Sequence, residues 1–204
     1  MSALSSPIQR LWLVLISCSV ILVFSGAAHA GANADKSSEL LERLRQGGLV
    51  LVLRHGDSPH DQSAAVGLSK DCRLGEGRGL SAKGLARSRR LGSLLVESDV
   101  ALLKAYTSRM CRSWDTAQLI AGAASVIPAA AQMTTDPAII AEFKKEIEIE
   151  ISAHPGQNIM LVSHSNIAPL YGAYAADDEA EVPSGYVFVV DPNTWNALGR
   201  FTTD

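Results

Sequence analysis

Two short apolar runs, each leading to a histidine, constrain the fold of this chain most. Leu49–Leu53 runs without alternation into Arg54 and His55, and Ile159–Val162 is followed closely by His164. Unalternating apolar runs of this length with β-branched members are typical of strands that are buried on both faces. The sequence therefore predicts two buried strands that each deliver an imidazole near the carboxyl end.

The periodicity around these runs predicts an α/β fold. The segment 137–153 contains EIEIEIS, which alternates like a strand, but its length, Pro137 at its start and its helical apolar spacing favour a helix. Ser81 is a suitable N-cap for the helix that follows it. Alternating strands and helices indicate a three-layer sandwich with a mostly parallel central sheet. The elements expected besides the two buried strands are helices at 38–46, 82–97, 112–124 and 137–153 and strands at 104–107 and 186–190.

The first thirty residues have the layout of a secretory signal peptide. Arg10 precedes a mainly apolar run from Leu11 to Phe24, and Ala28–Ala30 is a small-x-small cleavage site. We expect 1–30 to be removed, leaving one domain over 31–204 in the periplasm or outside the cell, with no membrane partner. Two alternatives stay open: an uncleaved anchor, although a bilayer needs about 20 apolar residues, and lipid attachment at Cys18.

The net charge bears on the kind of partner that the chain can bind, and the number of cysteines bears on whether it forms a disulfide. The formal net charge of −3 gives no broad basic field, so nucleic acid is not an expected partner. Once Cys18 is removed with the signal peptide, Cys72 and Cys111 remain. An even number of cysteines in an exported chain predicts a disulfide, with two unpaired thiols as the alternative.

Cationic residues gather where a ligand of such a sheet would bind. Ligands of open parallel sheets bind outside the carboxyl ends of the strands, where His55 and His164 should lie. A third strand end runs into TSRMCRSWDTA, which supplies Ser108, Arg109 and Arg112. Guanidinium groups match phosphate oxygens bidentately, and a helix N-terminus adds backbone donors. The predicted pocket is small, cationic and suited to a phosphoryl group.

Four segments in order carry a family resemblance. They are LRHG at 53–56, LSAKGLARSRRLG at 80–92, TSRMCRSWDTA at 107–117 and LVSHSN at 161–166. Together they resemble the motifs of the histidine phosphatase superfamily, the phosphoglycerate-mutase-like enzymes, and look most like its exported bacterial members. The resemblance spans about 50–170 and implies a phosphoglycerate-mutase-like fold and a phosphomonoesterase that uses no metal and no other cofactor.

The resemblance also implies roles for individual residues. His55 would attack phosphorus to form a phosphohistidine, which water then hydrolyses. Arg54 and Arg112 would hold the phosphoryl oxygens, and His164 would stabilise the transferring group from the opposite side. A neutral imidazole is a competent nucleophile near pH 7, which agrees with this assignment. The further residues expected to bind or position substrate are Gly56, Ser108, Arg78 and Asn166.

Other classes of protein stay open at this stage. HGDSPHD places His55, Asp57, His60 and Asp61 within seven residues, and a metallohydrolase could use such ligands, although the spacing matches no zinc motif. A phosphate-binding module without turnover and a phosphomutase of the same superfamily are further alternatives.

The substrate and the general acid are not assigned by the sequence. Export restricts the substrate to small phosphorylated compounds such as a sugar phosphate, an envelope glycolipid phosphate or a phosphopeptide. Carboxylates that could protonate the leaving group are Asp57, Asp136, Glu142 and the acidic residues at 177–181. None has a recognisable motif around it, so we expect weak proton donation and a preference for acidic leaving groups.

Overall fold

The computed structural model describes residues 36–61, 65, 77–131, 136–173 and 182–202. The predicted signal peptide, Cys72 and the acidic segment 177–181 lie outside these ranges, so the predictions that depend on them stay predictions. Glu39–Asp204 form a compact unit that holds the sheet and its helices. In the described part of the chain, no helix combines the length and the apolar character needed to cross a bilayer.

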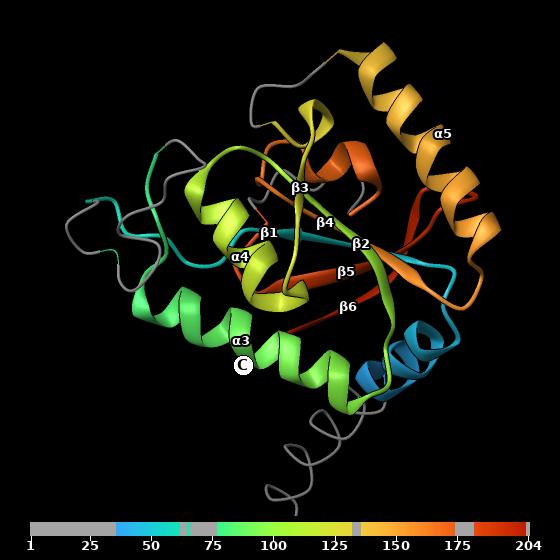
Figure 1. Ribbon diagram of the computed structural model, residues 1–204, viewed down its shortest axis with the longest axis horizontal. Coiled ribbons are helices and arrows are strands. Elements are labelled where there is room, and N and C mark those ends of the chain that lie inside the picture. Colours follow the sequence, from blue (N-terminus) through green and yellow to red (C-terminus); the bar gives the residue numbers. More distant parts are fainter. Residues whose placement is uncertain (1–35, 62–64, 66–76, 132–135, 174–181, 203–204) are drawn as a thin grey trace, which may run out of the picture. The chain divides into compact units, whose positions relative to one another are not determined.

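A six-stranded sheet lies at the centre of this unit (Figure 1). Its order is β3-β2-β4-β1-β5-β6. The first four strands in that order pair parallel, whereas β5 is antiparallel to β1 and β6 is antiparallel to β5. The prediction of an α/β fold with a mostly parallel sheet is confirmed. The strands are β1 Val50–Arg54, β2 Leu102–Thr107, β3 Ser125–Val126, β4 Asn158–Ser163, β5 Tyr186–Asp191 and β6 Asn196–Thr202.

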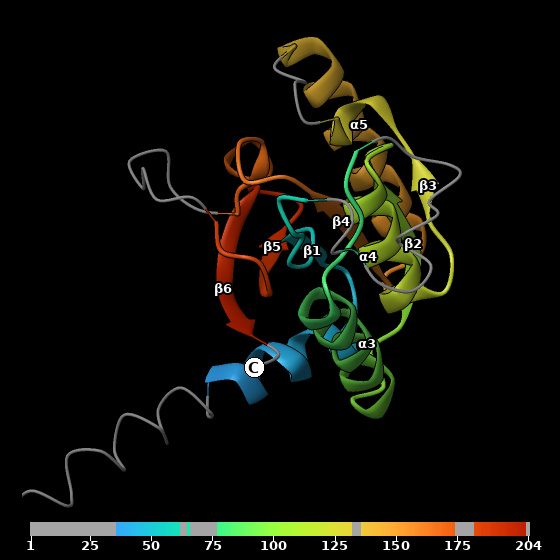
Figure 2. The same cartoon turned by 90° about the vertical axis from the view of Figure 1, so that its left-hand side faces the viewer.

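Helices cover both faces of the sheet, which completes three layers. The apolar core on one face includes Val50 and Val52 of β1 with residues of α5, and the core on the other face includes Leu51 and Leu53 with residues of α3 and α4. Figure 2 shows α5 and α3 on opposite sides of the strands. The helices are a segment at 36–46, α3 Ala82–Glu97, α4 Cys111–Ala121, α5 Pro137–Ala153 and the short 3-10 turns η3 Pro128–Ala130 and η4 Ala168–Tyr171.

Local sequence explains where two of the helices begin. Ser81 caps α3, because its side chain accepts a hydrogen bond from the Gly84 amide. Asp136 caps α5 in the same way through the Ala138 amide, and Pro137 occupies the first turn. The helical interpretation of 137–153 is confirmed, and the buried side chains at its apolar spacing are Ile140, Phe143, Ile147 and Ile151.

The structure departs from the sequence prediction at a few boundaries. The helix predicted to reach 124 ends at Ala121, because Gly122 adopts φ +76 and caps it in the left-handed region. The strands β3 and β6 were not predicted. Most of β6 is exposed or half-buried, so it lacks the alternation of buried and polar residues that identifies a strand.

One close contact joins α3 to the loop that follows β1. A Cβ atom on Gly84 would lie 2.2 Å from the carbonyl oxygen of Asp57, and the Ser81 amide donates to that same oxygen at 3.0 Å. The first turn of α3 therefore rests directly on the backbone two residues after His55.

Gly84→Ala should destabilise the protein even though alanine favours helices. The propensity gain of about 1 kcal/mol is opposed by a clash with main chain that cannot rotate away, and overpacking typically costs about 1–3 kcal/mol. Urea unfolding should show a lower midpoint for this variant. Gly156→Ala is the matched control, since nothing lies within 4 Å of a Cβ atom there. Equal midpoints for Gly84→Ala and wild type would refute the contact.

Candidate active site

Strand pairing places the two histidines side by side. β1 and β4 pair in a register that sets Arg54 opposite Ser163, and the His55 amide continues the ladder by donating to the Ser163 carbonyl at 2.9 Å. The next residue on each strand is therefore a histidine. The ring centroids of His55 and His164 lie 5.3 Å apart at 65°, and the two residues are 6% and 2% exposed. The sheet thus presents two buried imidazoles at the carboxyl ends of its central strands.

A cleft of about 420 Å³ opens above these rings. Three guanidinium groups surround it, whereas Asp57 contributes the one carboxylate among the described residues that line it. Five predicted site residues, His55, Arg54, Arg112, His164 and Arg78, meet here. The lining residues are Arg54, His55, Asp57, Ser58, His60, Arg78, Arg112, His164, Ser165 and Ser184.

Hydrogen bonds fix the tautomer of His55. Its Nδ1 lies 2.8 Å from the Gly56 carbonyl oxygen, which can only accept, so Nδ1 carries the proton. Its Nε2 lies 2.9 Å from Nε of Arg112, which can only donate. The unprotonated nitrogen of His55 therefore faces the guanidinium of Arg112.

His164 is held by Ser108, which directly follows β2, and by Arg112 and Ser113 on α4. Arg112 approaches its Nδ1 through Nη2 at 3.4 Å, while Nε2 lies 2.9 Å from the Ser108 hydroxyl and 3.4 Å from that of Ser113. Because the guanidinium can only donate, Nδ1 accepts and Nε2 donates to the serines. Ser108 therefore accepts a hydrogen bond from His164, a contact that the sequence did not predict, and Arg112 contacts both imidazoles.

The other two arginines are held at different places on the cleft wall. Arg54 donates from Nη1 to the Val182 carbonyl at 2.8 Å. Arg78 lies at the rim, where its Nη1 is 3.1 Å from Nδ1 of His60. The Arg78 carbonyl accepts from the Arg112 amide at 3.0 Å, which ties the rim segment to α4.

Burial and neighbouring cations keep both imidazoles neutral. Burial is the main cause that lowers the pKa of His55 to about 3, and Arg112, Arg54 and Arg78 add to the effect. The pKa of His164 is lowered to about 3 mainly by burial, with His55 and Arg112 contributing. Burial also lowers the pKa of the Arg112 guanidinium, which stays charged because arginine is protonated in proteins. The site therefore combines neutral nucleophilic nitrogens with permanent cations.

Several predicted features lie outside the cleft lining. Asn166 is exposed in the turn after β4, and Arg109 is exposed before α4. Gly56 packs its backbone against α3, where an added Cβ would approach Gly84 and Ser88 to 3.2 and 3.1 Å. The amides at the start of α4 are also occupied, since that of Ser113 donates to the Met110 carbonyl at 2.9 Å. Side-chain cations, rather than these amides, face the cleft.

The carboxylate that lines the cleft has a structural partner. Oδ2 of Asp57 accepts a hydrogen bond from the Ser81 hydroxyl at 2.5 Å, at the N-terminus of α3. Within the described residues, no cluster of three or more His, Cys, Asp or Glu side chains is arranged to hold a metal ion. The ligand set that HGDSPHD suggested therefore does not converge in this part of the chain.

This geometry defines a class of site whose charges and donors suit a phosphoryl group. Guanidinium groups can hold its oxygens while a neutral imidazole nitrogen faces its phosphorus. Residues 50–140 match the family model of the histidine phosphatase superfamily (branch 1), which confirms the resemblance to that superfamily. The match supports phosphatase or mutase activity. His164 lies beyond the matched residues and is brought to the site by the pairing of β4 with β1.

Solved structures support the fold. The protein histidine phosphatase SixA, complexed with tungstate, is 15% identical and has a TM-score of 0.55, with 76% of this chain and 97% of that chain covered. A candidate phosphohistidine phosphatase SixA from Agrobacterium tumefaciens is 18% identical, with a TM-score of 0.50 and the same coverage. A comparison with curated proteins finds no match.

The depressed pKa values predict that stability decreases in acid. A histidine whose pKa falls from about 6.5 when unfolded to about 3 when folded binds its proton preferentially in the unfolded state between those values. The free energy of unfolding should therefore fall as pH decreases through this window, by up to about 1.4 kcal/mol per pH unit for each histidine.

Urea unfolding at pH 7 and pH 5, in buffers without phosphate, measures this loss of stability. His55→Gln and His164→Gln should each lose less stability than wild type over that interval, because each removes one titrating imidazole. An equal loss in wild type and both variants would contradict the neutral buried state.

Proposed function

We propose that this protein is a metal-independent phosphomonoesterase that works through a phosphohistidine at His55. The observation that carries the proposal is the orientation of His55, whose unprotonated Nε2 faces the Arg112 guanidinium in the cationic cleft. A phosphate dianion placed among Arg54, Arg78 and Arg112 would put its phosphorus within reach of that nitrogen.

The proposed reaction has two steps. An oxygen of the substrate first takes the Arg112 donor away from His55, which releases the Nε2 lone pair to attack phosphorus. The P–N bond forms as the P–O bond to the leaving group breaks, and Arg54 and Arg112 stabilise the charge on the equatorial oxygens. Water then attacks the phosphorus of the phosphohistidine. A P–O bond forms as the P–N bond breaks, and this releases inorganic phosphate and restores His55.

No described carboxylate is placed as a dedicated proton donor to the leaving group. Asp57 accepts a hydrogen bond from the Ser81 hydroxyl at the start of α3, so one of its carboxylate oxygens is already held in a structural contact. Asp136 caps α5 and Glu142 is exposed on that helix. The enzyme should therefore act best on phosphates whose leaving groups need no proton.

The site is proposed to act outside the cytoplasm on a small phosphate ester. Support for export comes from the signal-peptide pattern at 1–30 and from the cysteine pair Cys72 and Cys111. A sugar phosphate, an envelope glycolipid phosphate or a phosphopeptide would fit the polar lining. The mass and the thiol titre of the protein recovered from the cell envelope test export, since an intact chain in which all three cysteines are reactive thiols would contradict it.

His55→Ala should abolish turnover of an aryl phosphate while leaving the fold intact. Wild type should show a phosphohistidine at His55 by mass spectrometry after rapid quenching in alkali, where this adduct survives. Arg112→Gln should lower kcat/KM about 10²–10³-fold, the typical loss for one preorganised donor. Far-UV circular dichroism controls for folding, and activity should be insensitive to a chelator.

The same assay separates the alternatives. Binding of inorganic phosphate without turnover would indicate a phosphate-binding module, and transfer to an added alcohol in preference to water would indicate a phosphomutase. Wild-type activity in His55→Ala would refute the phosphohistidine mechanism.

A series of leaving groups of rising pKa tests the proton donor. We expect kcat/KM to fall steeply as the leaving group becomes more basic, since no dedicated acid protonates it. Asp57→Asn should keep the same steep dependence. A flat dependence in wild type that becomes steep in one carboxylate-to-amide variant would identify an acid and refute the expectation.

A further inference from the structure

Four hydrogen bonds join the nucleophile and the phosphate-binding arginine in a closed ring. His55 donates from Nδ1 to the Gly56 carbonyl at 2.8 Å, and the Gly56 amide donates to the Thr116 hydroxyl at 2.8 Å. The Thr116 hydroxyl donates to the Arg112 carbonyl at 2.6 Å, and Nε of Arg112 donates back to Nε2 of His55 at 2.9 Å. Thr116 is the one side chain in the ring that touches neither the reacting imidazole nor the cleft.

The direction of donation around this ring is set by chemistry. An amide and a guanidinium only donate, and a carbonyl only accepts, so the Thr116 hydroxyl must accept from Gly56 and donate to Arg112. A hydroxyl is the side-chain group that can do both in one place. The arrangement leaves the proton of His55 on Nδ1 and its lone pair on Nε2.

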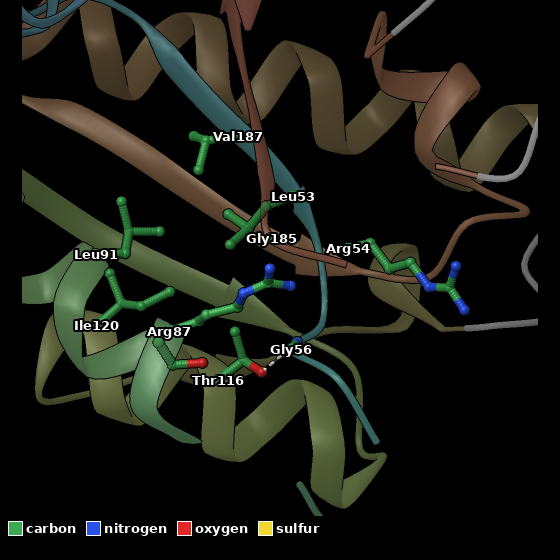
Figure 3. Close-up of a pocket in the computed structure, with 10 residues that line it drawn as sticks. Leu53, Arg54, Gly56, Arg87, Leu91, Thr116, Ile120, Gly185 and Val187 are labelled. Atoms are coloured by element: carbon green, nitrogen blue, oxygen red, sulfur yellow. Dashed lines mark hydrogen bonds between the residues drawn. The ribbon is translucent and has the colours of Figure 1, made fainter. Parts of the chain in front are cut away.

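The surroundings of Thr116 make its hydroxyl hard to replace. Thr116 is 2% exposed, so a Gly56 amide that loses this partner stays away from bulk solvent. Figure 3 shows the bond between Gly56 and Thr116 at the edge of a small cavity that also contacts Leu91 and Ile120. This cavity has a volume of about 20 Å³, and both Gly56 and Thr116 line it.

We infer that Thr116 is a positioning residue for His55. Its hydroxyl holds the Gly56 peptide, whose carbonyl sets the ring plane and the tautomer of His55. The same hydroxyl is bonded to the Arg112 carbonyl, so the Gly56 peptide and the His55 ring keep a defined position relative to the backbone of Arg112. The inference rests on the proposed function in so far as His55 is the nucleophile. Loss of the hydroxyl should impair attack by Nε2 more than it impairs binding of the phosphate, since Arg54 and Arg112 keep their charges.

Three variants of the full chain test this role. Thr116→Val keeps the shape and removes the hydroxyl, Thr116→Ser restores the hydroxyl, and Ser88→Ala is the control. Ser88 is a buried hydroxyl that contacts the same cavity but donates to the Gly84 carbonyl of its own helix, outside the ring. With an aryl phosphate, we expect Thr116→Val to lower kcat at least tenfold while the inhibition constant of inorganic phosphate changes less than threefold.

Thr116→Ser and Ser88→Ala should both stay within threefold of wild type in kcat. Three results would overturn the inference: a kcat of Thr116→Val within threefold of wild type, a loss in Thr116→Ser as large as that in Thr116→Val, or an equal loss in Ser88→Ala.

A spectroscopic measurement separates this inference from the proposed function. Long-range ¹H–¹⁵N spectra report which ring nitrogen of His55 carries the proton, whether or not the protein turns over a phosphate ester. Wild type should show the Nδ1-protonated tautomer, and Thr116→Val should show a mixture. An Nε2-protonated ring in wild type, or an unchanged tautomer in folded Thr116→Val, would refute the positioning role. An inactive wild type with the expected tautomers would refute the proposed function alone.

Discussion

The parallel pairing of β1 with β4 is the interaction on which the site depends. These strands lie in the middle of the sheet and are buried almost throughout, and their side chains pack into an apolar core on each face of the sheet. The same register sets Arg54 against Ser163 and brings the following residues, His55 and His164, together. The strand register thus sets the positions of the two imidazoles, and their hydrogen bonds with Arg112, Gly56 and Ser108 set the ring orientations.

Burial lowers the pKa of both kinds of basic group in this site but leaves them in different charge states. An imidazole removed from water loses its proton readily, since its ordinary pKa is close to neutrality, whereas a guanidinium keeps its charge under the same conditions. Crowding arginines around buried histidines therefore separates their roles without any acidic partner. The positive field of these arginines attracts an anionic substrate and also keeps the imidazole nucleophile unprotonated before the substrate binds.

The sequence predicted the parts of this structure that follow from local chemistry. The cap at Ser81 and the helix over 137–153 follow from side-chain and periodicity rules, and the motif residues His55 and Arg112 meet as expected. β6 escaped prediction because its pairing with β5 is a tertiary contact with a weak local pattern. Thr116 escaped as well: its role depends on a hydrogen bond to Gly56, sixty positions away in the chain, and a threonine in a helix gives no signal of it.

The acceptor that holds Arg54 is a backbone carbonyl, that of Val182. A main-chain acceptor is present whichever amino acid occupies that position, so the hydrogen bond to Arg54 does not depend on the Val182 side chain, which is buried in the apolar core. The nearby Ser184 does line the cleft, and a substitution there would change the cleft wall without removing this anchor of the arginine. Related enzymes could therefore differ in the residues of this cleft wall, and so in the substrates they accept, while the arginine that binds the phosphoryl group keeps its position.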